Sequence, residues 1–73
     1  MTGGAATITV TVNGEGQVVA AGITLLRLLE ELDEPYGVAV VEVNHKFVDP
    51  DAYPRIVLQD GDDVEVMLLA FGG

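Results

Sequence analysis

Residues 7–32, TITVTVNGEGQVVAAGITLLRLLEEL, predict a strand, a tight turn, a returning strand and a helix in that order. Apolar and polar side chains alternate at the start of this stretch, which is the period of a strand with one buried face. Asn13-Gly14 is the pair most typical of a two-residue hairpin turn, so we expect residues 17–20 to form the second strand. Thr24 can then cap a helix whose leucines recur at helical spacing. That helix has a single apolar stripe and must lie on an apolar surface.

The second half of the chain predicts three further extended segments separated by turns. Residues 38–43 are dense in β-branched side chains and suit a central strand. Turn residues surround a brief extended piece at 47–48 and a short edge strand at 56–58, and the last strand begins at Val64 and ends near residue 69. One helix packed on one face of a mixed sheet of four to five strands is the economical arrangement for this order. It is the order of a β-grasp domain, an α+β fold.

The core is expected to draw on the inward side of the strands and on the apolar stripe of the helix. The helix should cover one face of the sheet only. The predicted core residues are Ile8, Val10, Val12, Leu25, Leu28, Leu29, Val41, Val43, Val64, Val66 and Leu68.

The chain has 73 residues, enough for one domain, since a chain this short buries only about 60% of its unfolded surface. We divide it into a glycine-rich flexible leader at residues 1–6, the β-grasp domain at 7–71 and a flexible functional tail at 72–73. No cysteine is present and 49% of the residues are hydrophobic, so apolar packing must hold the core. The lack of cysteine agrees with a reducing compartment, and we expect the protein to be cytoplasmic.

The chain is strongly acidic, with twelve Asp and Glu residues against three Lys and Arg residues and a net charge of -9. Such a charge repels phosphate backbones and anionic lipids, so we expect neither nucleic acid nor a membrane among its partners. The longest apolar runs are also too short to span a bilayer. A basic partner surface would be attracted, although a strongly acidic surface is more often simply a means of staying in solution.

The residue types that usually carry catalysis are absent or badly placed. The chain has no Ser and no Cys, the usual nucleophiles of acyl transfer. Val19 stands where a phosphate-binding loop would need its third glycine, and the glycines before it precede a strand. His45 has no cysteine or second histidine near it in the sequence and is expected to be an exposed turn residue. The aspartates of residues 60–63 lack the continuation of a calcium loop and are expected to form a polar turn, so we predict neither an active site nor a metal site.

What remains is the C-terminal Gly72-Gly73, shortly after the last strand. A folded domain has no structural need for two glycines there, and an ordinary frayed tail is the alternative interpretation. If another enzyme takes the terminal carboxylate into a narrow cleft, side chains on the last two residues would clash, whereas glycine allows close approach. We therefore expect the C-terminus to be the working part of the chain, with both glycines mobile in the free protein.

In four places the sequence resembles the ThiS and MoaD families of prokaryotic sulfur carriers, relatives of ubiquitin. These places are the helix at 25–32, residues 41–44 followed by Val48, the turn at 58–62 with strand residues 64–66, and Gly72-Gly73. The last two together are the specific ones, and the resemblance covers nearly the whole chain from residue 7. It implies that an ATP-dependent, ubiquitin-activating-like adenylyltransferase adenylates the carboxylate of Gly73. Sulfur from a sulfur donor enzyme would then displace AMP and leave a thiocarboxylate.

The same resemblance implies that the chain is a protein co-substrate and not an enzyme, with no bound cofactor and with ATP used by the partner. The short loops and the absence of paired prolines before Gly72-Gly73 favour the ThiS carriers, which supply thiazole synthase in thiamine biosynthesis. Asp49-Pro50-Asp51 departs from their pattern and resembles some molybdopterin carriers. Five alternatives stay open: the small subunit of molybdopterin synthase, a carrier for cysteine synthesis, a carrier for tRNA thiolation, a ubiquitin-like protein modifier and a plain binding module.

A two-residue tail offers too little surface for selective binding, so an activating enzyme must also contact the folded domain. If Val64 and Val66 point inward, period two places Met67, Leu69 and Phe71 on the opposite face of the sheet. We expect these three apolar side chains to form a partner-binding patch beside the tail. The alternative is that they tuck under a loop, or that the alternation breaks near the end of the strand.

Overall fold

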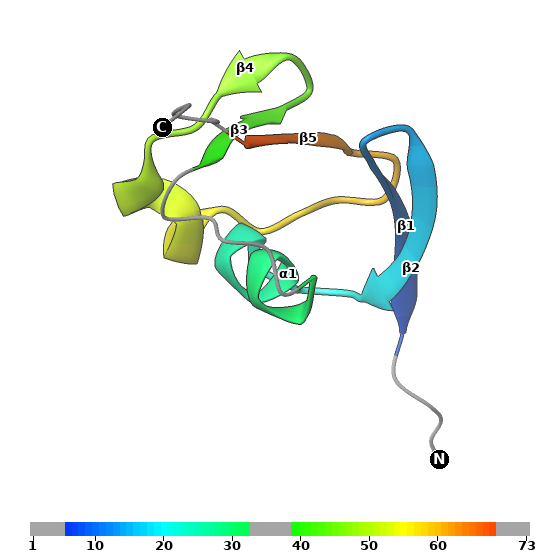
Figure 1. The fold of residues 1–73 in the computed structure, drawn as a ribbon. Helices are drawn as coiled ribbons and strands as arrows, with labels where there is room; N and C mark the ends of the chain where they lie inside the picture. The colour runs from blue at the N-terminus through cyan, green and yellow to red at the C-terminus, as the bar shows by residue number, and fades with distance from the viewer. Residues whose placement is uncertain (1–5, 33–38, 69–73) are drawn as a thin grey trace.

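The computed structural model describes residues 6–32 and 39–68. Within these residues lie five strands, one α-helix and one 3₁₀ helix (Figure 1). In sequence order they are β1 (Thr7–Val12), β2 (Glu15–Ala20), α1 (Leu25–Glu31), β3 (Ala39–Val43), β4 (Lys46–Phe47), the 3₁₀ helix η2 (Pro50–Arg55) and β5 (Asp63–Leu68). The strands form one sheet in the order β2-β1-β5-β3-β4.

The hairpin of β1 and β2 forms around the predicted turn. Val12 lies opposite Glu15, and antiparallel pairing runs the length of both strands, so β2 begins two residues earlier than predicted. Asn13 and Gly14 have φ angles of 51° and 85°. These are the left-handed conformations that a two-residue turn between twisted strands requires, and glycine adopts them without steric cost.

Strand β5 lies in the centre of the sheet. It pairs in parallel with β1, where Val12 lies opposite Val64, and antiparallel with β3, where Val43 lies opposite the same residue. The mixed sheet expected from the order of elements is therefore confirmed. Its central strand is the one that leads toward the C-terminus.

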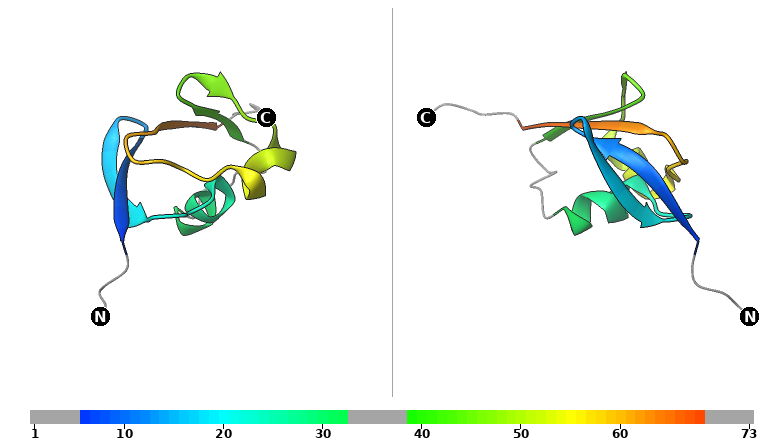
Figure 2. Two further views of the ribbon diagram at one scale, coloured as in Figure 1. Left: turned by 180° about the vertical axis from the view of Figure 1, so that it is seen from behind. Right: turned by 90° about the vertical axis from the view of Figure 1, so that its right-hand side faces the viewer.

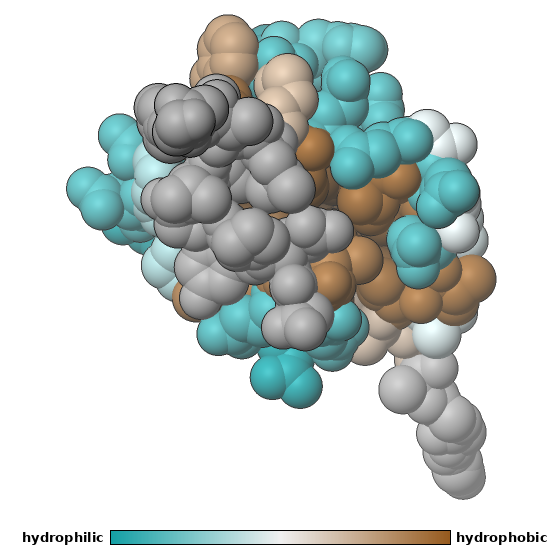
Figure 3. Space-filling model, in the orientation of Figure 1, coloured by the Kyte–Doolittle hydropathy of each residue, from teal (hydrophilic) through white to brown (hydrophobic). Residues whose placement is uncertain are grey.

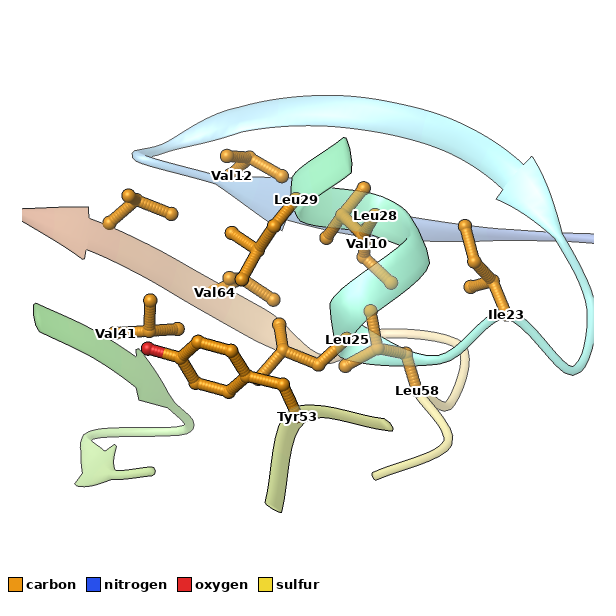
Figure 4. Packing of buried hydrophobic residues seen from close by; sticks show 11 residues of the cluster. Val10, Val12, Ile23, Leu25, Leu28, Leu29, Val41, Tyr53, Leu58 and Val64 are labelled. Atoms are coloured by element: carbon orange, nitrogen blue, oxygen red, sulfur yellow. The ribbon is translucent and has the colours of Figure 1, made fainter. Parts of the chain in front are cut away.

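Helix α1 packs on one face of the sheet, as predicted, and lies on the same side in every view (Figures 1 and 2). Thr24 is its N-cap, and the Thr24 hydroxyl oxygen accepts a hydrogen bond from the backbone N–H of Arg27 at 3.2 Å. Leu25, Leu28 and Leu29 are buried and point into the apolar cluster of Figure 4. The predicted apolar stripe thus faces the sheet.

The core lies between α1 and the sheet, and residues from the connecting segments complete it (Figure 4). Eight of the predicted core residues are buried, namely Val10, Val12, Leu25, Leu28, Leu29, Val41, Val64 and Val66. Ile8 and Val43 are half-buried and pack against this cluster, and the side chain of Leu68 is outside the described part of the structure. Ile23, Tyr53 and Leu58 are also buried, although the sequence patterns do not predict them.

The predicted short strand at residues 56–58 is wrong. This segment leaves the sheet and runs beside the residues that start α1, which it meets at a single β-bridge. The N–H of Leu25 donates to the carbonyl of Ile56 at 2.8 Å, and the N–H of Leu58 donates to the carbonyl of Ile23 at 2.9 Å. The edge of the sheet beyond β3 is formed by β4 instead.

Helix η2 comes directly before residues 56–58 and directs this segment away from the sheet. Asp49 caps it by accepting a hydrogen bond from the N–H of Asp51 at 3.0 Å, and Pro50 occupies its first turn, where a missing N–H costs nothing. The helix turns Tyr53 into the core, where it is 2% exposed. The Asp-Pro-Asp stretch, which the sequence predicts to be a turn, therefore starts a helix that closes one side of the core.

The predicted leader and tail fall largely beyond residues 6–32 and 39–68. Residues 1–5 and 72–73 are outside the described part of the structure. Ala6, the last residue of the predicted leader, accepts a hydrogen bond through its carbonyl from the N–H of Ala21 at 3.0 Å. No helix within the described ranges is long and apolar enough to cross a membrane.

Candidate functional site

The predicted reactive end of the chain, Gly72 and Gly73, lies outside the described residues, as do Leu69 and Phe71. The structure describes the strand that leads to them, β5, as far as Leu68. Five residues follow Leu68 in the sequence, so Gly73 can lie no farther than about 18 Å from the end of β5. The surface around the end of β5 is therefore the described part of the candidate site.

Hydrogen bonds hold this end of β5 on both sides. On one side it pairs with β3 from Val64 to Leu68. On the other side β1 ends at Val12, and the next residue continues the pairing. The side-chain Oδ1 of Asn13 accepts a hydrogen bond from the N–H of Val66 at 2.8 Å, and the N–H of Asn13 donates to the carbonyl of Val64 at 2.9 Å. The strand before the C-terminal residues is thus fixed within the sheet.

Met67 lies on the face of the sheet opposite α1, as the strand period predicts. Val66 is 8% exposed and points toward the helix, whereas Met67 is 39% exposed. Glu65 shares the face of Met67, because side chains two apart in a strand point the same way. The expected orientation of Met67 is confirmed, and the contact it makes with a partner stays a prediction.

Two further apolar side chains lie on this outer face. Val40 is directly opposite Met67 in the β3–β5 pair, and Phe47 of β4 is directly opposite Glu42 of β3. Directly opposite side chains share a face, so we define Val40, Phe47 and Met67 as the outer patch. Phe47 is 72% exposed, and hydrophobic and hydrophilic groups lie next to each other over β4 (Figure 3). The sequence patterns do not predict the place of Phe47, because a two-residue strand has no period of its own.

A cluster of titratable side chains lies beside the outer patch. Glu42 and Glu65 are directly opposite each other on β3 and β5. His45 occupies the turn between β3 and β4, and its Nδ1 lies 3.6 Å from Oε1 of Glu65. Its Nε2 lies 3.7 Å from Oδ2 of Asp63. The predicted exposure of His45 is confirmed, but the structure places it beside the carboxylates of Asp63 and Glu65, which are far from it in the sequence.

The other aspartates before β5 hold the loop together. Asp62 accepts a hydrogen bond through Oδ2 from the N–H of Gln59 at 2.8 Å and another through Oδ1 from the side-chain amide of Asn44 at 3.0 Å. Asp60 accepts one through Oδ1 from the N–H of Thr9 at 2.8 Å. These bonds confirm the polar turn that the sequence predicts.

The sequence and the fold are both similar to known proteins. The model of the ThiS family matches residues 5–73. The sulfur carrier protein ThiS of Escherichia coli (strain K12) is 31% identical over 61 residues, which cover 84% of this chain and 92% of that protein. The crystal structure of the thiamine biosynthesis protein ThiS from Geobacter metallireducens superposes with a TM-score of 0.80 at 29% identity, covering 90% of this chain and 100% of that one.

Proposed function

The chain belongs to the ThiS family, and on that basis we propose that it is a sulfur carrier protein of thiamine biosynthesis whose reacting group is the carboxylate of Gly73. The observation that carries this proposal is the family match, which covers the folded domain and runs through Gly72-Gly73. In this role the chain is a co-substrate that other enzymes act upon. It holds no cofactor of its own, and ATP is bound by a partner.

Adenylation is the proposed first step, because a free carboxylate is a poor electrophile. An adenylyltransferase would join the Gly73 carboxylate to the α-phosphate of ATP and release pyrophosphate. A persulfide sulfur of a donor enzyme would then attack the carbonyl carbon and expel AMP, a good leaving group. Cleavage of the resulting acyl disulfide by a thiol leaves a thiocarboxylate on Gly73 and a disulfide on the thiol's side. Two terminal glycines suit this sequence of steps, since they let the enzymes approach the backbone closely.

The outer patch is the proposed contact for the adenylyltransferase. Met67 and Val40 are opposite each other on neighbouring strands, and Met67 lies on the strand that leads to Gly73. Leu69 and Phe71 would extend this surface if the alternation of β5 continues past Leu68. An apolar patch beside the reactive end would let the enzyme select the folded domain and receive its C-terminus together.

Three partners follow from the proposed chemistry. They are the adenylyltransferase, a sulfur donor enzyme that carries the persulfide, and thiazole synthase as the acceptor of the sulfur. The net charge of -9 favours basic surfaces on these enzymes. We propose the cytoplasm as the compartment in which they meet, in keeping with a chain that has no cysteine.

Intact-mass measurement tests this function directly. The chain is incubated with its adenylyltransferase, ATP and the persulfide-loaded donor, and its mass should rise by the difference between one sulfur and one oxygen. A variant that lacks Gly73 should show no rise, while its circular dichroism and melting temperature match the full chain. If the truncated variant still gains that mass, the terminal carboxylate is not the reacting group.

A further inference from the structure

We propose that Glu42, His45 and Glu65 form a binding site for a divalent transition-metal ion of the Zn²⁺ type. Each of the three residues offers one ligand atom, and these atoms all lie within 4.8 Å of one another. The Nδ1 of His45 and the Oε1 of Glu65 are 3.6 Å apart. Neighbouring ligands around a tetrahedral Zn²⁺ with bonds of about 2.0–2.1 Å are about 3.4 Å apart, so this pair needs little movement to share an ion.

The sheet itself brings two of the three ligands together. Glu42 and Glu65 are direct cross-strand neighbours, and like charges in that position destabilise a sheet. Both side chains are half-buried, which weakens the screening of their repulsion by water. A bound cation would turn this unfavourable pair into two ligands.

Asp63 gives independent support for a metal-binding role of His45. A histidine that binds a metal through one ring nitrogen usually donates the N–H of the other to a carboxylate. In this turn Nδ1 faces Glu65, while Nε2 faces Oδ2 of Asp63 at 3.7 Å. The other oxygen of Asp63 is held in place, because Oδ1 accepts a hydrogen bond from the hydroxyl of Thr11 at 2.8 Å. A movement of the His45 Nε2 by about 0.8 Å toward Oδ2 of Asp63 would bring the two atoms within hydrogen-bond distance.

The donor set identifies the class of ion. One imidazole nitrogen and two carboxylate oxygens suit Zn²⁺, whereas Ca²⁺ and Mg²⁺ prefer oxygen ligands alone. The His45 side chain is 77% exposed, so water can fill a fourth position. The site involves neither Gly73 nor the proposed sulfur chemistry, and it can be tested without any partner enzyme.

Zn²⁺ titration of the chelator-treated full chain by calorimetry tests the proposal. We expect one Zn²⁺ per chain, and His45→Asn should weaken binding at least tenfold. Asparagine keeps the turn intact, because it tolerates the φ of 69° at this position, but it is not a zinc ligand. Asp63→Asn should weaken binding by about tenfold through the lost orientation of the ring. Glu30→Gln is the matched control for Asp63→Asn, since it also removes one negative charge, from an exposed site on α1, and should leave the affinity unchanged.

The ring nitrogens of His45 provide a second measurement. In wild-type protein Zn²⁺ should shift the Nδ1 resonance of His45 more than the Nε2 resonance, and the same ordering should hold in Asp63→Asn. Equal Zn²⁺ affinity of wild type and His45→Asn would overturn the proposal. An equal loss of affinity in Glu30→Gln and Asp63→Asn would also count against it, because it would reduce the effect of Asp63 to the overall negative charge.

Discussion

Asn13 joins the first hairpin to the strand that leads to the C-terminus. Its backbone adopts the left-handed φ of 51° that the turn requires. Strand β1 ends at Val12, and beyond it the Asn13 side chain accepts the hydrogen bond from the N–H of Val66 at 2.8 Å. One residue therefore supports both the turn of β1 and β2 and the pairing of β5.

We expect Asn13→Ala to lower the free energy of unfolding by about 2–4 kcal/mol, because alanine is strained at this φ and cannot accept the hydrogen bond. Asn13→Gly is the matched control, since it keeps the turn and removes the hydrogen bond, and should cost about 1–3 kcal/mol. Urea denaturation of the two variants measures both losses. A wild-type midpoint in either variant would show that the hydrogen bond from Val66 does not stabilise the fold.

We expect Tyr53 to make the stability of the fold depend on pH in the alkaline range. Burial raises the pKa of its phenol, and the carboxylate of Asp49 raises it further. The neutral phenol is thus favoured in the folded state. Its contribution to stability is complete below the unfolded pKa of about 10 and is lost as the pH rises through the higher folded pKa.

A spectrophotometric titration can isolate this group, because the chain has two tyrosines, Tyr36 and Tyr53. In Tyr36→Phe, only Tyr53 titrates, and its midpoint should lie above the ordinary value of about 10 in folded protein. In urea the midpoint should return to that value. A folded midpoint equal to the unfolded one would mean that burial does not perturb the phenol.

At the scale of elements, α1 contributes three fully buried leucines to the core on one face of the sheet. Leu29 is fully buried and lies within the apolar cluster (Figure 4). Leu26 of the same helix is only half-buried. The two residues have the same helix propensity and the same chemistry. They differ in how much packing each would lose.

Leu29→Ala should therefore lower the free energy of unfolding by about 2–5 kcal/mol, a large share of a small domain's total. Leu26→Ala is its control and should cost distinctly less. Denaturant midpoints at constant slope report the two values. Equal losses would mean that α1 is rotated on the sheet so that both leucines are buried to the same extent.

The regular elements are those that sequence patterns could predict. Alternation finds β1 and β5, Asn13-Gly14 finds the hairpin turn, and leucine spacing with Thr24 finds α1, because each is a local pattern with a fixed period. Residues 50–58 have no such period. Their 3₁₀ helix starts at the Asp49 cap and Pro50, and the burial of Tyr53 and Leu58 depends on packing against α1 and the residues just before it, so neither could be predicted from local patterns.

The candidate site divides in the same way. The outward position of Met67 follows from the period of its own strand. The register between strands sets the position of Phe47 and brings Glu42, His45 and Glu65 close together. No single stretch of sequence contains that register. Cross-strand neighbours become predictable only when the pairing is known.

The whole molecule combines a net charge of -9 with a small apolar patch on the outer face of its sheet. Charge acts over a distance and steers a basic partner, but it is weakened by salt. Apolar contact acts at short range and chiefly sets how long a complex lasts. Association with the adenylyltransferase should therefore slow as salt rises, while the need for the outer patch stays at every salt concentration.

Met67→Glu separates these two contributions. Because Met67 is 39% exposed, this substitution should leave folding nearly intact. It should raise the KM for adenylation about tenfold or more and leave kcat unchanged, because it removes binding that the ground state and the transition state share. Val18→Glu is the matched control: it adds the same charge at a 70% exposed apolar residue on β2, two strands from β5, and should leave KM near the wild-type value. Steady-state adenylation of both variants at low and high salt measures the effect. If Met67→Glu is folded and adenylated with the wild-type KM, the outer patch has no part in recognition; if Val18→Glu is equally impaired, the added charge alone is the cause.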